Sequence, residues 1–136
     1  MANPHVFERK NVYKDLDFSF NSLALSRDLG TKTDTNAINQ SVKNLVTTNF
    51  GERPFHPEIG SDVYALLFEP ASPQTTSAIE DAIKNVLDNY EPRIQVQSVR
   101  VDEEGIDFNR VYVRILYTFI EKNTDAEVDI VLERLR

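Results

Sequence analysis

Apolar side chains recur at helical spacing in two segments of the first half of this chain, each bounded by residues that begin or end helices. The first helix is expected to begin at Asp34 or Thr35 and to end before Gly51, which tolerates left-handed geometry. A short helix is expected between Ser61, which can cap it, and Pro70, which prevents its continuation. The apolar stripes of the two helices are Ile38, Val42, Leu45 and Val46, and then Val63, Leu66 and Leu67.

The clearest helical pattern covers residues 76–90, after a loop marked by Pro73. Ser77 and Glu80 have the spacing of a capping box at its start. Pro92 ends this helix, because the residue before a proline is pushed towards extended geometry. Its apolar face consists of Ile79, Ile83, Val86, Leu87 and Tyr90.

From residue 94 onward the apolar period changes to two, which is typical of strands. Ile94 and Val96 alternate in one phase, whereas Val99 and Val101 alternate in the other. Because the side-chain period of a strand cannot absorb that shift, we expect a bulge near Gln97.

Residues 110–121 have apolar side chains on both faces, so this strand should be central in its sheet or covered by a partner. Residues 102–109 are expected to form the hairpin connection before it, and a last strand runs to the end of the chain. The apolar face of these two strands consists of Val111, Val113, Ile115, Tyr117 and Phe119, and of Val128, Ile130 and Leu132. The pattern therefore predicts an α+β fold, in which an antiparallel meander of three to four strands carries two main helices and one short helix on one face.

The N-terminal region has a weaker pattern. Residues 1–14 are polar and are expected to form an N-terminal arm, whereas residues 15–136 form a single domain. Alternation over residues 15–20 predicts a half-buried strand, and residues 27–35 read as a loop.

Length and charge exclude several classes of protein. The chain has 136 residues, no cysteine and a formal net charge of −7. Nucleic-acid binding through phosphates needs clustered Lys and Arg, which this acidic chain lacks, and the acidic balance also disfavours anionic membranes. No secretory signal or membrane span is evident, so we expect a protein made in the cytoplasm.

The residues that usually carry catalysis are arranged unfavourably for it. There is no Gly-rich phosphate loop and no nucleophile elbow, and His5 and His56 have no metal-ligand spacing, so we expect no cofactor and no metal. The run from Asp102 to Glu104 lacks the spaced ligands of a calcium loop. Glycosidic hydrolysis needs two facing carboxylates in a sugar cleft, and nothing in the sequence singles out such a pair among 22 acidic residues.

The triplet Glu91-Pro92-Arg93 at the end of the longest expected helix is the first candidate binding cluster. Extended geometry after the proline places Glu91 and Arg93 on the same side of the chain. They could clamp polar groups of a partner or join a buried ionic network. The alternative is a helix stop with two surface charges.

The second candidate cluster is the proline-rich segment from Arg53 to Gly60. It could be a rigid docking loop, with Arg53 as a bidentate donor and Phe55 as an apolar anchor. The alternative is a packing loop in which Phe55 and Ile59 close the core.

Three motifs in this order resemble one known family. They are residues 51–62 (GERPFHPEIGSD), residues 67–70 (LFEP) and residues 89–94 (NYEPRI). The chain is similar over residues 13–134 to the baseplate wedge subunits of T-even-type contractile phages, a family shared with the baseplate component of type VI secretion systems.

This resemblance implies a structural protein of the virion tail, without enzymatic activity and with one copy in each wedge of a six-fold baseplate. It implies partner contacts at Glu91, Pro92 and Arg93, which would face the core bundle of other wedge proteins. Arg53 and Phe55 are also candidate partner-binding residues, and for them the docking and the packing interpretations both stay open. It also implies a fold similar to the sheath handshake domain, whose sheet offers a strand edge to the first sheath ring. The residues of the sheath-facing strands would be Val111, Val113, Ile115, Val128, Ile130 and Leu132. Members of the family also carry a tail lysozyme label, so a peptidoglycan glycosidase is the alternative function.

Overall fold

The computed structural model describes residues 14–16, 31–33, 35–102 and 110–133. The chain divides into two compact units, Met1–Gln40 and Ser41–Arg136. In the first unit, β1 (Lys14–Leu16) pairs antiparallel with β2 (Thr31–Thr33). The expectation of a loop over residues 27–35 is therefore wrong at Thr31–Thr33, where main-chain pairing rather than side-chain alternation makes a strand. The expected arm over residues 1–14 lies almost wholly outside the described residues, so the domain boundary stays a prediction.

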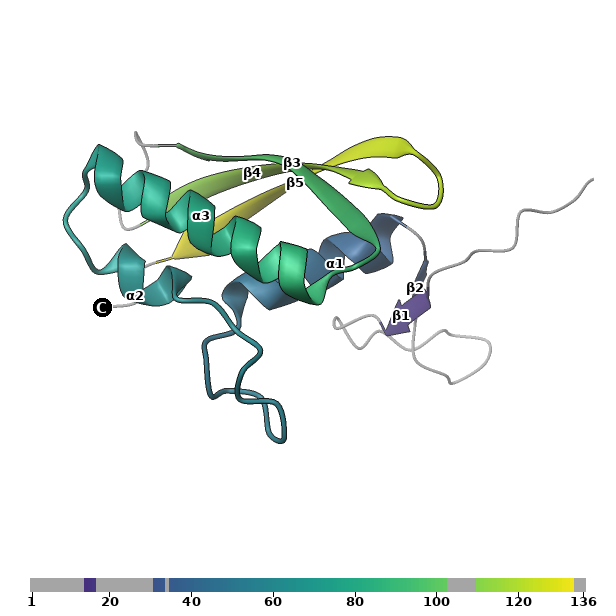
Figure 1. Cartoon of the computed structure of the whole chain (residues 1–136), viewed down its shortest axis with the longest axis horizontal. Coiled ribbons are helices and arrows are strands. Elements are labelled where there is room, and N and C mark those ends of the chain that lie inside the picture. Colours follow the sequence, from purple (N-terminus) through teal and green to yellow (C-terminus); the bar gives the residue numbers. More distant parts are fainter. Residues whose placement is uncertain (1–13, 17–30, 34, 103–109, 134–136) are drawn as a thin grey trace, which may run out of the picture. The chain divides into compact units, whose positions relative to one another are not determined.

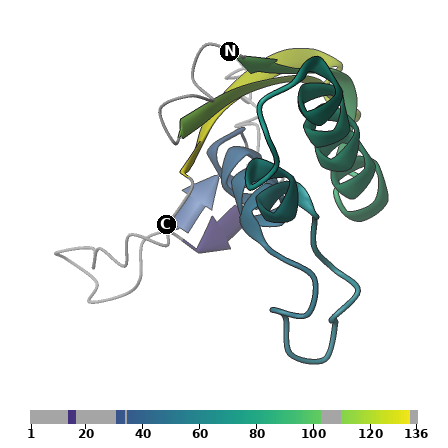
Figure 2. The same cartoon turned by 90° about the vertical axis from the view of Figure 1, so that its left-hand side faces the viewer.

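The second unit is built on a three-stranded antiparallel sheet in the order β3-β4-β5. Its strands are β3 (Ile94–Asp102), β4 (Arg110–Phe119) and β5 (Thr124–Glu133). One face of the sheet is covered by α2 (Val63–Leu67) and α3 (Pro73–Tyr90), together with the part of α1 (Thr35–Thr47) that belongs to this unit (Figures 1 and 2). The predicted α+β meander with helices on one face is confirmed.

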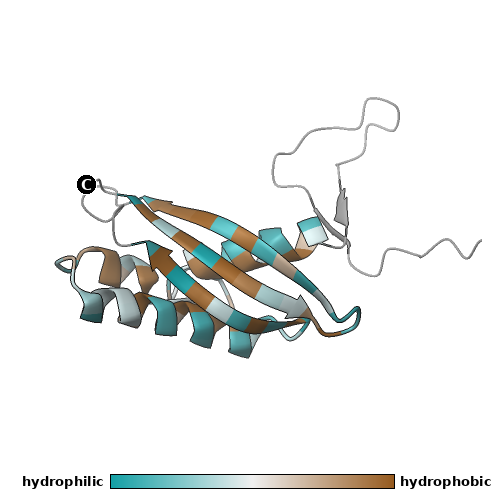
Figure 3. Ribbon diagram, turned by 90° about the horizontal axis from the view of Figure 1, so that it is seen from above, coloured by the Kyte–Doolittle hydropathy of each residue, from teal (hydrophilic) through white to brown (hydrophobic). Residues whose placement is uncertain are grey.

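Alternation along the strands sorts side chains between the two faces of the sheet, and Figure 3 shows apolar and polar positions following one another along each strand. The buried face carries the core, and its members on β4 and β5 are at most 5% exposed: Val111, Val113, Ile115, Tyr117, Phe119, Val128, Ile130 and Leu132. The opposite face keeps some exposed apolar residues: Tyr112, Leu116 and Val131. The strand with two apolar faces, β4, is the central strand, as its pattern predicts.

The register confirms the predicted irregularity in β3. Its pairing with β4 shifts between Val96 and Ser98, at the point where the apolar phase changes. The pairing of β4 with β5 is continuous from Arg110 opposite Glu133 to Phe119 opposite Thr124. Most of the expected hairpin connection, residues 103–109, lies outside the described residues.

Two predicted helix starts are wrong, although the helices themselves are confirmed. The Ser61 hydroxyl does not cap α2 but donates to the Val46 carbonyl at 2.9 Å, and Asp62 occupies the cap position without a side-chain bond. The helix α3 begins at Pro73 rather than near Ser77, because the Ser72 hydroxyl accepts from the Thr75 amide at 3.2 Å. A proline suits this first position, since it has no N–H to satisfy.

Candidate partner-binding site

The end of α3 positions the first candidate cluster. Glu91 is the C-terminal cap of the helix, and Pro92 turns the chain into β3. The Glu91 side chain is 2% exposed, whereas that of Arg93 is 31% exposed. Arg93 donates from Nε to Oε1 of Glu91 at 2.5 Å and from a terminal nitrogen to Oε2 at 2.6 Å. This paired geometry is the strongest common form of a carboxylate–guanidinium contact.

A third donor completes the surroundings of the Glu91 carboxylate. The Ser41 hydroxyl, from α1, donates to Oε2 at 2.5 Å. Burial by itself raises the pKa of Glu91, but the hydrogen bonds from Arg93 and Ser41 and the positive charge of Arg93 together hold that pKa below its ordinary value. Burial and the negative charge of Glu91 in turn raise the pKa of Tyr117 to about 12.

Of the two interpretations of the triplet, the structure excludes a pair of plain surface charges. Glu91 and Arg93 form an ion pair in which the carboxylate is buried and the guanidinium reaches the surface. Nothing in the sequence connects Ser41 or Tyr117 with this ion pair, because Ser41 lies fifty positions before Glu91 and Tyr117 belongs to the apolar face of its strand.

The second cluster is a loop of residues 48–62, which we call the proline loop, and its ends are held together by main-chain bonds. The Ser61 amide donates to the Thr48 carbonyl at 2.9 Å, beside a bridge between Asn49 and Ser61. Further along the loop, the Gly51 amide donates to the Pro57 carbonyl at 2.9 Å. Gly60 has no room for a side chain, because a Cβ would lie 2.5 Å from the Phe50 nitrogen. The proline loop is therefore an ordered element.

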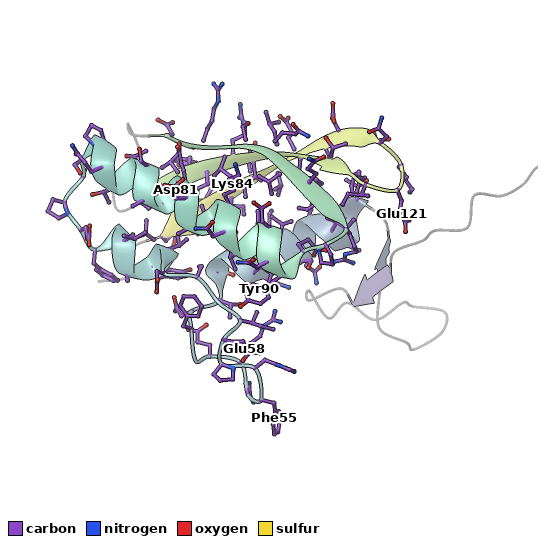
Figure 4. All side chains as sticks on the ribbon, in the orientation of Figure 1. Phe55, Glu58, Asp81, Lys84, Tyr90 and Glu121 are labelled. Carbon is purple, nitrogen blue, oxygen red and sulfur yellow. The ribbon has the colours of Figure 1, made fainter. Side chains whose placement is uncertain are left out.

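Side-chain bonds hold this loop further. Glu52 accepts from the Asn49 amide at 3.0 Å and from its side-chain nitrogen at 2.8 Å. These bonds, with the main-chain bond first, lower the pKa of Glu52. The Tyr90 hydroxyl donates to the Glu58 carbonyl at 2.9 Å, which ties the loop to the end of α3 beside the first cluster (Figure 4).

At the tip of the proline loop, Phe55 points into solvent (Figure 4). It is 96% exposed, and its φ of 71° lies in the left-handed region that an aromatic residue rarely adopts. The interpretation in which Phe55 closes the core is therefore wrong, whereas Ile59 is half-buried. Arg53, two residues away, is exposed and has no ion-pair partner in the described part of the chain.

The six residues expected on sheath-facing strands all lie on the helix-covered face, at most 5% exposed. Their side chains belong to the core of this chain, so these six side chains are not available to a partner. The central strand β4, with Val111, Val113 and Ile115, has a neighbour on each side. The edges of this sheet are β3 and β5.

The described residues offer poor support for catalysis. The buried carboxylate of Glu91 has three hydrogen bonds and a lowered pKa, whereas a glycosidase acid needs a raised one. A groove of about 500 Å³ beside α3 contains Asp62 and Asp81, but both carboxylates are exposed to water. Within the same described ranges, no group of three or more His, Cys, Asp or Glu is placed to hold a metal ion, and no helix is long and apolar enough to cross a membrane.

Sequence comparison connects the chain to one family. A family model described as baseplate wedge protein gp25 matches residues 32–124. The baseplate wedge protein gp25 of Enterobacteria phage T4 is 32% identical over 116 residues, which are 85% of this chain and 86% of that protein.

Solved structures agree with the fold. A Geobacter sulfurreducens protein described as a candidate tail lysozyme has a TM-score of 0.69 at 25% identity, over 74% of this chain and 91% of that one. A chain of the anti-feeding prophage baseplate has a TM-score of 0.61 at 15% identity, over 91% of this chain and 87% of its own. A chain of the pyocin R2 baseplate after contraction has a TM-score of 0.53 at 21% identity, over 89% of this chain and 98% of its own. The last two likenesses concern the fold alone.

Proposed function

The chain belongs to the family of baseplate wedge protein gp25 and is a structural subunit of a contractile-tail baseplate, and from this premise we propose how it meets its neighbours. It docks on the core bundle of other wedge proteins through the proline loop and the Glu91–Arg93 corner. Its sheet offers an edge strand from which the first ring of sheath protein assembles. One copy serves each wedge of the six-fold baseplate.

The observation that carries the docking role is the exposure of Phe55. An aromatic side chain that is 96% exposed contributes nothing to the core, and its left-handed φ of 71° costs about 1–2 kcal/mol. The closed proline loop nevertheless holds it in this position. A preordered aromatic residue next to an arginine has the composition of an interface hot spot, because little conformational entropy is left to lose on binding.

The Glu91–Arg93 corner supplies a second contact of different chemistry. Glu91 is a positioning residue: it holds the Arg93 guanidinium in one orientation through two hydrogen bonds. Pro92 fixes the backbone between them. The exposed part of Arg93 then meets carboxylate or carbonyl groups of the core bundle.

Genetic complementation tests this role. A phage lacking its own copy of the chain is supplied with Phe55→Ser or Arg53→Ser, and finished tails are counted by electron microscopy. We expect both variants to fold as the parent does, because both side chains are exposed, and to lower the number of sheathed tails by at least about tenfold, as for an interface hot spot.

The matched control is Phe68→Ser, which removes another exposed aromatic residue, 55% exposed, outside the proline loop. It should support normal numbers of tails. Normal tail assembly by a folded Phe55→Ser, Arg53→Ser double variant would refute the docking role of the loop.

A further inference from the structure

The two edges of the β3-β4-β5 sheet differ in how accessible they are to an added strand. At β3, the register shift between Val96 and Ser98 interrupts the regular spacing of main-chain groups. Further along the same strand, the Val101 amide donates to the Glu80 carboxylate of α3 at 3.1 Å. A bulge and a side chain that occupies a main-chain donor are two known ways in which proteins block a sheet edge. The β3 edge is therefore closed to strand addition.

Within the described residues, the β5 edge has neither a bulge nor a main-chain donor that is occupied by a side chain. Its ten residues pair with β4 without a register shift, and the strand contains no proline. No side chain in the described part of the molecule bonds to a main-chain group of β5. Because antiparallel pairing uses the groups of alternate residues, about half of the N–H and C=O groups of β5 point away from β4. They form a regular template for one more strand.

The exposed face of β5 is acidic at every second residue except Val131. These acidic residues, which we call the acidic stripe, are Asp125, Glu127, Asp129 and Glu133. Two are balanced by β4, since Arg114 pairs with Asp129 at 2.8 Å and Arg110 pairs with Glu133 at 3.2 Å. Arg114 also lies in the field of Glu127, so one guanidinium serves two carboxylates. The stripe keeps a negative excess around Asp125 and Glu127.

The other face of β5 sets a second requirement. Val128, Ile130 and Leu132 are buried and form the last apolar row of the sheet on the helix side. Neighbouring strands place side chains opposite one another on each face. In a strand added to β5, every second residue would be apolar and would continue this row. The residues between these apolar ones would lie beside the acidic stripe on the exposed face.

We propose that β5 is the edge that accepts a partner strand, and that the partner is an extended protein segment with apolar residues alternating with Lys or Arg. This inference rests on the proposed role of the sheet in sheath assembly and specifies which edge acts and what it selects. A second copy of this chain is a poor occupant, because pairing β5 with β5 would place two acidic stripes together. The stripe thus excludes self-association while attracting a basic strand.

Peptide titration of the full chain tests both parts of the proposal. The probes are two peptides of about ten residues, the length of β5, in which valine alternates with lysine or with glutamate. Binding is followed by NMR chemical-shift changes at low ionic strength, and the site by hydrogen exchange of main-chain amides. We expect the lysine peptide to bind more tightly than the glutamate peptide and to protect amides of β5.

Charge-reversal variants separate the effect of the acidic stripe on peptide affinity from the effect of the overall charge of the chain. In Asp125→Lys, Glu127→Lys we expect the affinity for the lysine peptide to fall by about fivefold or more, since two cross-strand pairs turn repulsive. The matched control is Asp81→Lys, Asp88→Lys, which makes the same change of net charge on the exposed face of α3 and should have a much smaller effect. Equal loss in both variants, protection at β3, or failure of the lysine peptide to bind would overturn the proposal.

Failure of this inference can be distinguished from failure of the proposed function. If the peptides bind at β3 or without charge preference while the chain still enters baseplates and supports sheathed tails, only the edge and its chemistry are wrong. If purified baseplates lack the chain, the structural role itself is wrong. Self-association of the parent chain through β5, detected by analytical ultracentrifugation and protection of β5 without peptide, would also refute exclusion of a second copy.

Discussion

Replacing Arg93 by alanine should destabilise the folded chain by about 2–3 kcal/mol at neutral pH. In the parent chain the Glu91 side chain is 2% exposed, and the variant removes the guanidinium that donates two of the three hydrogen bonds to its carboxylate. Removing one partner of a fully buried ion pair costs about 3–5 kcal/mol. We expect a smaller loss because Arg93 is 31% exposed, so water can enter its place, and because Ser41 still donates.

The effect of pH on this variant follows from the pKa of Glu91. In the parent chain that pKa is lowered on folding, so Glu91 contributes stability above its unfolded pKa of about 4.3, and the contribution is lost as pH falls through the folded pKa. Without Arg93, burial dominates and raises the folded pKa. Protonation then favours the folded variant, so the deficit in unfolding free energy should narrow on acidification.

Urea unfolding of the full chain, followed by circular dichroism, measures this difference. Curves at about pH 7 and about pH 3.5 avoid the isoelectric point near 4.8, where the uncharged chain is least soluble. Adding Glu91→Gln to Arg93→Ala should restore part of the lost stability at neutral pH, because the buried charge is removed.

The matched control is Arg114→Ala, which breaks the exposed pair with Asp129, whose two side chains are 61% and 62% exposed. Surface pairs contribute about 0–1 kcal/mol, so this variant should remain close to the parent chain. If Arg93→Ala costs no more than Arg114→Ala, or if its deficit does not change with pH, the Glu91–Arg93 pair is not the buried network described above.

Two further changes test the local structure by the same urea assay. Gly60→Ala should cost about 1–3 kcal/mol, because the new Cβ would lie 2.5–2.8 Å from main-chain atoms of Asn49 and Phe50; a stable variant would mean that the base of the proline loop is not closely packed. Ser72→Ala should lower the free energy of unfolding by about 1 kcal/mol, because it removes the cap of α3, whereas Ser77→Ala should lower it little. A larger loss in Ser77→Ala than in Ser72→Ala would favour the capping box expected from the sequence.

The candidate site was predictable where its signal was local. Glu91, Pro92 and Arg93 are consecutive, and the proline after a strongly periodic helix is enough to place the two charges on one side. Ser41 lies fifty positions before Glu91, and no pattern in either segment connects them. The sequence also left two interpretations of Phe55, since an aromatic residue between prolines suits a core or an interface equally, and only its exposure of 96% separates them.

Periodicity determined the helices, the strands of the β3-β4-β5 sheet and the bulge of β3, because each depends on neighbours within a few residues along the chain. It did not find β2, which is a strand because it pairs with β1. Motif order likewise determined the family. Helix starts were less certain, since Ser61, Ser72 and Ser77 can all cap and the choice depends on what else each hydroxyl can reach. Tertiary structure alone decided that Glu91 is buried in a network and that β3 is closed by Glu80 while β5 stays open. Both depend on where segments distant in sequence come to lie, which local side-chain patterns do not encode.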